Sequence, residues 1–328
     1  MSLSSIYKAT LLTLSFLLIT LVAIASFYHS PPNQSTSISL FSPPTPQSSP
    51  APKAIKLIFA GDLSFDRYIR QMIQEYGFDH PLQDLKPLLL TADLAIVNLE
   101  GPITNKPSVS VYSAIGSPQN YILTSPPETA QTLYNHNLKL VNLGNNHILN
   151  MGQPGLTQTY DYLTTANIQY FGNPGAPTHN RYIVKTLKGL NLGFVNYNQF
   201  TPNGLQTALD DIQTVNPISD LVIVIAHWGN EYQITANQTI QALAHSFIDL
   251  GADLVIGSHP HVVQQQEVYK NKTIYYSLGN FVYDQYFSSE TSTGLLVETD
   301  INPQTKSIFF TNYKLQHLLT GQTVFKQD

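Results

Sequence analysis

The sequence predicts an α/β fold in which strands and helices alternate at first and strands dominate the last part. Short runs rich in Val, Ile and Leu, such as residues 94–97 and 221–226, are typical of buried strands. Helix-like segments such as residues 67–76 and 236–250 lie among these runs. From residue 267 to 315, short apolar segments alternate with turn residues, which indicates a largely β C-terminal layer.

The folded part is expected to begin near Ala54 with a strand over residues 55–60, which the turn residues Gly61 and Asp62 close. A helix over 67–76 and a strand over 94–97 follow. Residues 103–125 are rich in Ser and Pro and predict a loop. The remaining expected elements are a helix over 127–135, a strand over 138–143, a helix over 156–166, short strands over 168–171, 182–187 and 192–195, a strand over 221–226, a helix over 236–250 and a strand over 254–257.

Composition excludes several functional classes. Apolar residues make up 42% of the 328-residue chain, enough for a sizeable core, whereas charged residues make up only 11%. The net charge is −5, from 16 basic and 21 acidic residues, so we expect no nucleic-acid partner. Cysteine is absent, which excludes disulfides, thiolate metal sites and cysteine nucleophiles. Any bound metal must therefore be held by His, Asp, Glu or Asn.

The N-terminal segment predicts a membrane anchor. Residues 9–27 carry no charge and are mostly apolar, and Lys8 precedes them. Because this run exceeds the usual length of a signal-peptide core, we favour an uncleaved, single-pass transmembrane helix, with the rest of the chain outside the cytoplasm. The small residues Ala23 and Ala25 leave a second interpretation open, in which a signal peptide is cleaved and the protein is secreted.

A linker is predicted between this segment and the folded part. Residues 28–52 contain seven Pro and seven Ser but no acidic residue, Lys or Arg, a composition that cannot bury a core. Such a linker argues against a helix of the globular domain over residues 9–27. The expected organisation is an anchor or signal peptide over 1–27, a Pro/Ser-rich linker over 28–53, a folded domain over 54–318 and a tail over 319–328.

Residues able to ligate a metal stand where five of the apolar runs end. They are Asp62, Glu100, Asn146 with His147, His227, and the pair His259 and His261. In open α/β sheets, ligands bind beyond the carboxyl ends of the strands, where loops from different strands converge. A lone histidine after a strand is more often structural, so the prediction rests on the whole set. We therefore expect these side chains to meet at one edge.

Their chemistry suits a metal centre. Oxygen and imidazole ligands without thiolate favour Mn, Fe, Zn or Mg. The number of candidate ligands suffices for two ions that share a bridging carboxylate. Such a pair lowers the pKa of a bridging water and holds the attacking oxygen against its target.

Six motifs, in order between about residues 55 and 285, resemble those of the CapA family of poly-γ-glutamate capsule synthesis proteins, a branch of the calcineurin-like metallophosphoesterases. The motifs are Gly61-Asp62 with Arg67, Asn98-Leu99-Glu100, Asn145-Asn146-His147, His227-Trp228-Gly229-Asn230-Glu231, Gly257-Ser258-His259-Pro260-His261-Val262 and Ser277-Leu278-Gly279-Asn280-Phe281. The resemblance implies a four-layer α/β/β/α metallophosphoesterase-like sandwich with a dinuclear metal centre at one edge.

Carried over to this sequence, the resemblance implies two divalent metal ions, which would be Mn, Fe or Zn. Their ligands would be Asp62 and His261 for the first ion, Asn146, His227 and His259 for the second, and Glu100 as the bridge. His147 would not bind metal. It would be the catalytic residue, acting as a general acid or stabilising charge on the transferring group.

Other motif residues would contact the substrate or support the metal ligands. They are Arg67, Asn98, Trp228, Glu231 and Asn280. The guanidinium of Arg67 suits a phosphate or carboxylate, although a surface ion pair explains this residue equally well.

Two positions depart from the usual pattern. Ser64 stands where most metallophosphoesterases have a histidine, which the CapA-like branch also lacks. Asn150 stands where an acidic residue usually follows His147. An amide can hydrogen-bond to His147 but cannot stabilise its charged form as a carboxylate would.

Two functions are open. The first is an extracytoplasmic metal-dependent hydrolase that acts on a phosphoester or related bond in the metabolism of a capsule or envelope polymer such as poly-γ-glutamate. The second is a membrane-tethered, non-catalytic component of polymer synthesis or export, which uses the metal site for binding beside other envelope-polymer synthesis proteins. A degenerate hydrolase without metal is a third interpretation, supported only by Ser64 and Asn150.

Overall fold

The structure, a computed structural model, describes residues 53–173 and 180–327 of the 328-residue chain. The described residues belong to one compact unit, Pro52–Asp328. Within them, no helix combines the length and the apolar character needed to cross a membrane. The segment over residues 9–27, for which we predict an anchor, lies outside the described residues, as does almost all of the linker.

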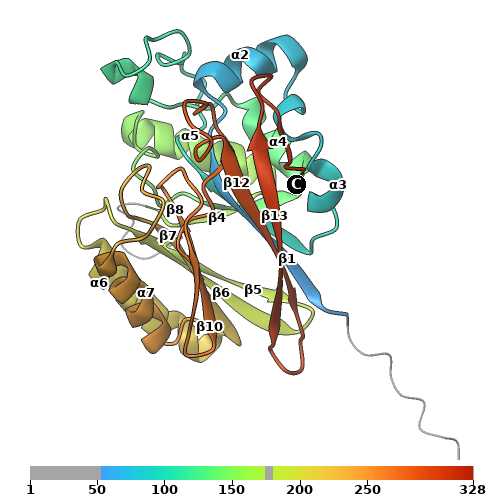
Figure 1. Ribbon diagram of the computed structural model, residues 1–328, viewed down its shortest axis with the longest axis vertical. Coiled ribbons are helices and arrows are strands. Elements are labelled where there is room, and N and C mark those ends of the chain that lie inside the picture. Colours follow the sequence, from blue (N-terminus) through green and yellow to red (C-terminus); the bar gives the residue numbers. More distant parts are fainter. Residues whose placement is uncertain (1–52, 174–179, 328) are drawn as a thin grey trace, which may run out of the picture. The chain divides into compact units, whose positions relative to one another are not determined.

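The first sheet, which contains the first strand of the chain, has eight strands in the described residues (Figure 1). Its order is β14-β13-β12-β1-β2-β3-β4, and β11 also pairs with β1. The strands from β1 to β4 are parallel, whereas β12, β13 and β14 join them as an antiparallel extension. Their bounds are β1 (Ile55–Leu63), β2 (Leu94–Leu99), β3 (Leu138–Asn142), β4 (Gln169–Phe171), β11 (Asn280–Val282), β12 (Thr293–Ile301), β13 (Ile308–His317) and β14 (Thr323–Phe325).

The second sheet contains six strands in the described residues, in the order β5-β6-β7-β8-β10-β9. Its centre is parallel, and a hairpin closes each side. The bounds are β5 (Tyr182–Leu187), β6 (Leu190–Asn198), β7 (Leu221–His227), β8 (Leu254–Ser258), β9 (Gln266–Tyr269) and β10 (Lys272–Tyr275).

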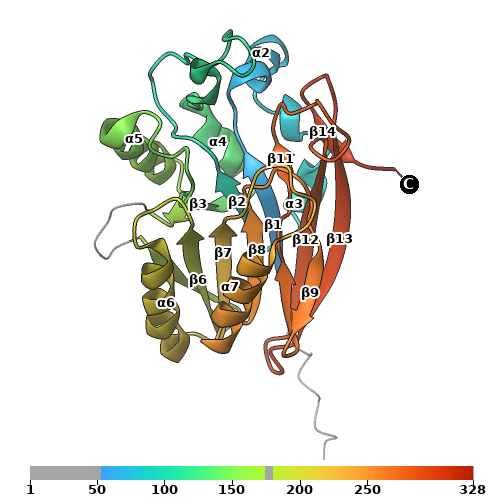
Figure 2. The same cartoon turned by 60° about the vertical axis from the view of Figure 1, so that its left-hand side comes forward.

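Helices cover the outer faces of both sheets. The first sheet carries α2 (Arg67–Tyr76), α3 (Lys86–Leu89), α4 (Glu128–Asn135) and α5 (Gly152–Thr165), and the second carries α6 (Gly204–Val215) and α7 (Gln238–Asp249). Short 3₁₀ turns are η1 (His80–Leu82), η2 (Pro118–Tyr121) and η3 (Asn216–Ile218). Figure 2 shows α6 and α7 lying against β6, β7 and β8.

Three apolar layers hold this arrangement together. Along β1, Ile58 packs into the cluster beneath the helices of the first sheet, whereas Leu57 and Phe59 pack between the two sheets. This alternation follows from the two-residue period of a strand, and it buries β1 on both faces. The same inter-sheet layer includes Phe194 from β6 and Ile223 from β7. The predicted α/β class and its α/β/β/α layering are therefore confirmed for the described residues.

The C-terminal residues extend the sheet further than expected. Residues 319–328, for which we predicted a tail, include β14, which pairs with β13 through Leu315 and Phe325. The structure also contains α6, a helix for which the sequence pattern made no prediction.

The parallel strands end at one common edge, and this positions the functional residues. The register aligns Asp62 of β1 with Asn98 of β2 and with Asn280 of β11, and it aligns Asn98 with Asn142 of β3. In the second sheet, the register aligns His227 at the end of β7 with Ser258 at the end of β8. Polar residues from both sheets therefore leave the core at the same place.

Candidate metal centre

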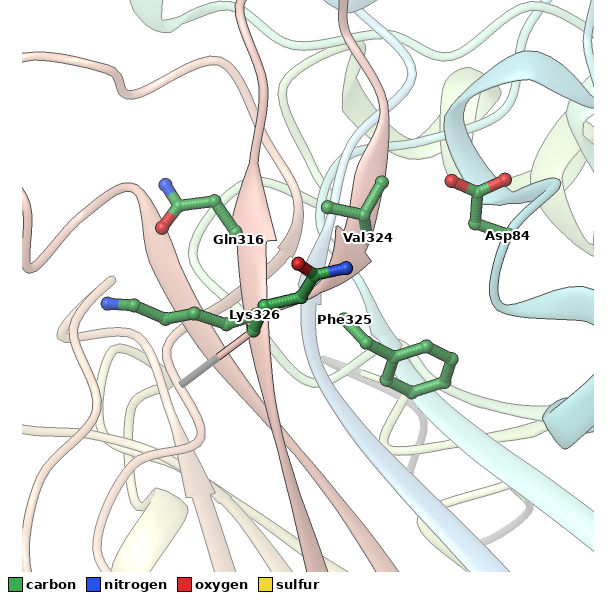
Figure 3. Close-up of a pocket in the computed structure, with 6 residues that line it drawn as sticks. Asp84, Gln316, Val324, Phe325 and Lys326 are labelled. Carbon is green, nitrogen blue, oxygen red and sulfur yellow. The ribbon is translucent and has the colours of Figure 1, made fainter.

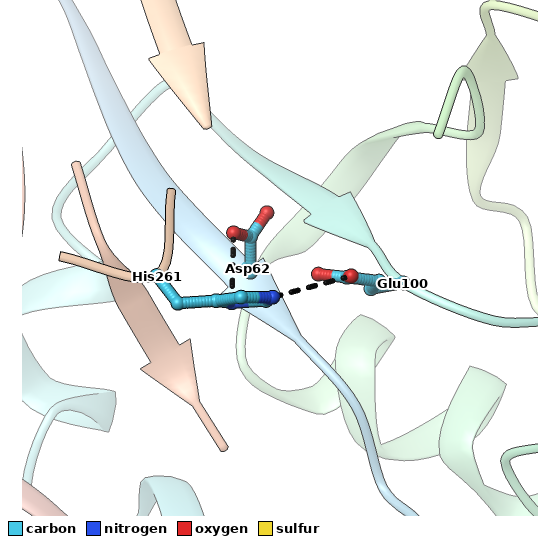
Figure 4. A group of neighbouring side chains, drawn as sticks. All are labelled: Asp62, Glu100 and His261. Carbon is cyan, nitrogen blue, oxygen red and sulfur yellow. Dashed lines mark ion pairs between the residues drawn. The ribbon is translucent and has the colours of Figure 1, made fainter. Parts of the chain in front are cut away.

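Three of the predicted metal ligands form one buried cluster (Figure 4). Asp62, Glu100 and His261 each offer a ligand atom, and these atoms lie within 4.8 Å of one another. The Nδ1 atom of His261 is 3.4 Å from Oδ2 of Asp62, and its Nε2 atom is 3.8 Å from Oε1 of Glu100. Two carboxylates and an imidazole at this separation match the oxygen and nitrogen donors of a divalent metal site.

Glu100 shows that the cluster fits a cation. Its carboxylate is fully buried, and neither oxygen has a hydrogen-bond partner. Burial, together with the nearby charge of Asp62, raises the pKa of Glu100 well above its usual range. An unpaired buried carboxylate is costly, whereas a bound cation would satisfy both oxygens.

Asp62 is held more firmly. Its side chain accepts hydrogen bonds from Nδ2 of Asn98 at 2.7 Å and from the backbone N–H of His259 at 3.0 Å. Burial raises the pKa of Asp62 to about 6, against the lowering effect of these two hydrogen bonds. The hydrogen bonds fix the orientation of the carboxylate and leave it free to bind on its remaining lone pairs.

The His-Pro-His segment presents neutral imidazoles to this cluster. Oδ1 of Asn280 lies 2.9 Å from Nδ1 of His261, which places the proton on Nδ1 and leaves the Nε2 lone pair facing Glu100. Burial lowers the pKa of His261 well below its usual range and that of His259 to about 4. Metal ligation requires this neutral form. Both histidines have a positive φ, 95° for His259 and 58° for His261, a strained backbone typical of functional sites.

The second predicted group gathers next to the first. Nε2 of His227 lies 2.8 Å from Oδ1 of Asn146, and the His227 and His259 rings are 4.8 Å apart. Nδ1 of His227 lies 3.0 Å from Oγ of Ser258 and 3.9 Å from Oδ1 of Asp62. The structure therefore brings all six residues that the resemblance assigns to metals to one edge.

His147 lies beside Glu100, with its Nε2 atom 3.7 Å from Oε1. Its Nδ1 atom lies 2.9 Å from Oδ1 of Asn150, and the same amide oxygen accepts a hydrogen bond from the backbone N–H of Leu123. Burial lowers the pKa of His147. Asn150 thus orients the ring without a charge, and the Nε2 lone pair of a neutral His147 is set to accept a proton.

Arg67 is the cation whose charge acts on both Glu100 and His147. It forms a 2.5 Å ion pair with Asp284, and its guanidinium lies 4.8 Å from the centre of the Tyr283 ring. Burial alone would lower the pKa of Arg67, but Tyr283 and Asp284 raise it. The side chain is therefore a fixed, mostly buried charge at the side of the cluster.

The other predicted residues have different positions. Asn98 forms a hydrogen bond with Asp62, and Asn280 forms one with His261. Glu231 is exposed, and its charge acts on Glu100. Trp228 is fully buried in the layer beneath α7, where its Nε1–H donates to the carbonyl of Tyr276 and its ring stacks on Phe247. This tryptophan packs the core and lies on the opposite side of the sheet from the ligands.

Sequence reasoning missed other residues at the site. Phe200 places its ring 4.5 Å from that of His259, Ser258 contacts His227, and two further asparagines, Asn142 and Asn196, lie behind Asn98. Phe200 lies in the turn after β6 and is not a ligand-type residue. Asn196 of β6 directly follows the predicted strand over 192–195 and could have been noticed as an amide at a strand end. Asn142 stands one residue before the end of the predicted strand over 138–143 and could have been noticed there.

A surface pocket elsewhere does not mark the site. It has a volume of about 610 Å³ and lies beside β13 and β14, where its walls include Asp84, Phe325 and Lys326 (Figure 3). None of the residues lining it belongs to the metal cluster.

Comparison with known proteins identifies the relatives of this chain. The family model described as "Bacterial capsule synthesis protein PGA_cap" matches residues 56–285. The capsule biosynthesis protein CapA of Bacillus anthracis is 26% identical over 261 residues, which cover 74% of this chain and 63% of that protein. The PGA biosynthesis protein CapA of Bacillus subtilis (strain 168) is 25% identical over 254 residues, which cover 73% and 66%. The chain thus spans slightly less than two thirds of the length of these relatives.

Solved structures resemble the chain only distantly. The structure of TT1561 of Thermus thermophilus has a TM-score of 0.42 and 9% identity, and covers 79% of this chain and 99% of its own. Vps29 of Chaetomium thermophilum has a TM-score of 0.32 and 12% identity, and covers 83% of this chain and 96% of its own. The family match, by contrast, spans well over half of the sequence and includes every residue of the metal cluster. The chain therefore belongs to the PGA_cap family of bacterial capsule synthesis proteins.

Proposed function

We propose that the protein is a metal-dependent hydrolase that cleaves a phosphoester or related bond in the metabolism of a capsule or envelope polymer such as poly-γ-glutamate. The observation that carries this proposal is Glu100. Both of its oxygens are buried without a hydrogen-bond partner, and Oε1 lies within 4 Å of Nε2 of His147 and of His261. Either a proton or a bound cation removes the cost of such a carboxylate, and the neighbouring Asp62 and His261 supply the further ligands that a cation needs.

Two ions fit the residues present. Asp62 and His261 would hold the first, Glu100 would bridge, and the second would rest on three further side chains. Those are Asn146, His227 and His259. The donor set of oxygens and neutral imidazoles suits Mn, Fe or Zn. When bound, such a pair supplies a nucleophilic water of lowered pKa and polarises the bond under attack.

The chain's own residues would orient the reaction around that centre. His147, held by Asn150, would accept a proton at Nε2 and then return it to the leaving oxygen. Arg67, fixed by Asp284, would stabilise negative charge on the transferring group.

The compartment belongs to the same proposal. Residues 9–27 would anchor the protein in the cell membrane by a single pass, with the catalytic domain extracytoplasmic, or would be cleaved to release it. The Bacillus relatives are named for capsule and PGA biosynthesis, which supports a place beside envelope-polymer synthesis proteins.

A non-catalytic role is the second candidate. In that case the metal site would bind a polymer or a partner protein during synthesis or export. One relative, 29% identical over 192 residues, is named as a probable polyglutamine synthesis accessory protein, from Mycobacterium tuberculosis. The missing carboxylate at Asn150 favours this candidate, because an amide cannot stabilise a protonated His147.

Turnover by the full chain, purified in detergent and loaded with Mn or Zn, separates the two candidates. The hydrolase proposal expects turnover of at least one class among phosphomonoesters, phosphodiesters and poly-γ-glutamate, with loss of activity in Glu100→Gln. Glu290→Gln, at an exposed position, is the matched control. Metal binding without turnover of any of these substrates would favour the non-catalytic role.

A further inference from the structure

Exposed aromatic rings border the histidines of the metal cluster. The ring of Phe200 is 4.5 Å from that of His259, and the ring of Tyr232 lies 6.3 Å from that of His261 at an interplanar angle of 30°. Phe287 meets Tyr232 edge-on at 5.2 Å. Phe200 and Tyr232 are each 43% exposed, and Phe287 is 66% exposed. We call these three residues the aromatic mouth.

The structure holds two of these rings in place. Tyr232 has a φ of 64°, its backbone N–H donates to the carbonyl of Pro260, and its hydroxyl accepts a hydrogen bond from Gln285. The backbone N–H of Phe200 donates to Oδ1 of Asn198. Rings fixed before binding lose little conformational entropy when a ligand covers them.

Apart from the proposed ions, the fixed charges around the mouth favour a ligand with few anionic groups. Arg67 shares its charge with Asp284, and the exposed Glu231 adds a negative charge beside Tyr232. Lysines instead pair with aspartates that precede strands, at the opposite edge of the sheets. Examples are Lys188 with Asp93 at 2.6 Å and Lys306 with Asp220 at 2.8 Å.

We propose that the substrate of this site carries an uncharged ring, such as a sugar, that packs against the aromatic mouth, and a single anionic group at the metal ligands. The C–H face of a sugar ring complements an aromatic face, and ligand sites typically use few polar groups to orient a ligand. This inference rests on the proposed function and narrows its substrate to a glycosyl ester of phosphoric acid rather than a polyanionic chain.

Titration calorimetry with Mn-loaded full chain tests the substrate class. The probes are inorganic phosphate, the phosphonate analogue of glucose 1-phosphate, and a γ-linked glutamate pentamer. Phe200→Ala should weaken the sugar phosphonate about fivefold to thirtyfold and leave phosphate unchanged. Phe309→Ala, equally apolar and exposed on β13, should change neither.

The outcomes are distinguishable. Equal weakening of phosphate and sugar phosphonate by Phe200→Ala, or pentamer binding tighter than the sugar phosphonate, would overturn the substrate class and leave the metal site intact. A wild-type chain that binds no Mn would overturn the proposed function and this inference together.

A second inference rests on a chain of amides that crosses between the two sheets. Nδ2 of Asn196 in β6 donates to Oδ1 of Asn142 in β3 at 2.9 Å. Nδ2 of Asn142 donates to Oδ1 of Asn98 in β2 at 3.0 Å, and Nδ2 of Asn98 donates to Asp62 in β1 at 2.7 Å. Every amide in this series points its donor toward the metal ligand.

The backbone is shaped around this amide chain. A Cβ atom on Gly144 would lie 2.1 Å from Oδ1 of Asn196, and one on Gly172 would lie 2.5 Å from Oδ1 of Asn142. No side chain fits at either position while the amides keep their places. Asn145 adds another donor to Oδ1 of Asn98 at 3.2 Å.

We infer that Asn142 and Asn196 are positioning residues for Asp62. Asn196 holds Asn142, and Asn142 together with Asn145 holds the oxygen of Asn98. The two outer amides thus help to direct the Nδ2 donor of Asn98 at Asp62 without touching the metal. Loss of such indirect support typically lowers metal affinity about 10-fold to 100-fold.

Metal affinity and melting temperature, measured on the same full-chain samples, test this role. Asn196→Ala should weaken Mn binding about tenfold while the melting temperature of the metal-free protein changes little. Asn191→Ala, in the same strand but at its far end, is the matched control and should change neither. A lower melting temperature with unchanged Mn affinity would show that the amide chain is merely structural. Unchanged values for both quantities would also overturn the inference.

Discussion

The two edges of the sheets treat acidic residues differently. Where the parallel strands begin, Asp93, Asp220 and Asp253 each stand directly before a strand, pair with a lysine, and accept a backbone N–H from the neighbouring strand. Where the strands end, Asp62 and Glu100 are buried, and within the described residues their ion pairs are with histidines rather than with a lysine. The first arrangement closes the sheet edge at little cost, whereas the second is unfavourable until a cation binds.

The pKa values show the same contrast. A hydrogen bond from Lys306 lowers the pKa of Asp220, whereas burial raises that of Asp62 to about 6 and raises that of Glu100 well above its usual range. Residue type alone therefore does not distinguish a structural acid from a metal ligand. The distinction comes from burial and from the lack of a direct ion pair with a lysine or arginine among the described residues, since Arg67 acts on Glu100 but pairs with Asp284.

The largest expected effect is that of removing the bridging carboxylate. Glu100→Ala should abolish Mn binding at both sites and reduce turnover to background, because both ions would share this ligand. The metal-free variant should nevertheless be more stable than metal-free wild type, because an unpaired buried carboxylate is gone. Denaturant titrations should give it a free energy of unfolding about 1–2 kcal/mol higher. Metal-free Glu100→Ala that is less stable than wild type would contradict the contrast between the edges.

The next effect concerns His147. His147→Ala should leave Mn content unchanged and cut turnover about 10²-fold to 10⁴-fold, as for a lost general acid–base group. The loss should be smaller for substrates with good leaving groups, which need less protonation. Loss of bound Mn in this variant would show instead that His147 is a ligand.

A smaller effect is expected at Asn150. Asn150→Asp would place a carboxylate against Nδ1 of His147 and raise the pKa of the imidazole. The pH–rate profile should shift toward higher pH, and turnover should rise severalfold with unchanged Mn content. An unshifted profile would mean that the ring does not titrate during turnover.

The smallest effects are opposite pH dependences at the two edges. The folded-state pKa of Asp62 is raised, so its contribution to metal-free stability is complete below about pH 4 and is lost as pH rises through 6. The pKa of Asp220 is lowered, so its contribution is present above about pH 4 and is lost as pH falls. Relative to wild type, Asp62→Asn should gain stability as pH rises from 4 to 6. Asp220→Asn should be less stable than wild type by a constant amount above pH 4, and this deficit should shrink as pH falls below 4. Denaturant titrations from pH 2 to 7 in a chelator measure both, and a change of both variants in the same pH window would contradict the account.

The strands were predictable because their residues are apolar on both faces, as in residues 221–226. Helix α6 was missed although Ala208, Ile212 and Val215 pack against the sheet at helical spacing. Its start carries no signal, since Asn203 has a left-handed backbone and its side chain makes no capping hydrogen bond. The membrane anchor over residues 9–27 stays a prediction.

The site was predictable where ligand-type residues end apolar runs, because all parallel strands end at one edge. Trp228 was wrongly predicted to lie at the site. Successive side chains of a strand point to opposite faces, so Trp228, the residue after His227, faces α7 rather than the ligands. Asn196 directly follows the predicted strand over 192–195, and Phe200 lies in the turn after β6. Their roles depend on the spacing between the two sheets, which strand patterns do not encode.

Electron paramagnetic resonance of the Mn-loaded full chain tests the central claim most directly. A carboxylate that bridges two Mn ions couples their spins, so wild type should bind two ions per chain and show a coupled spectrum. Glu100→Ala, loaded in parallel, should lose that spectrum. Wild-type protein that binds no Mn, or that binds ions giving only isolated signals, would contradict a dinuclear centre built on Glu100.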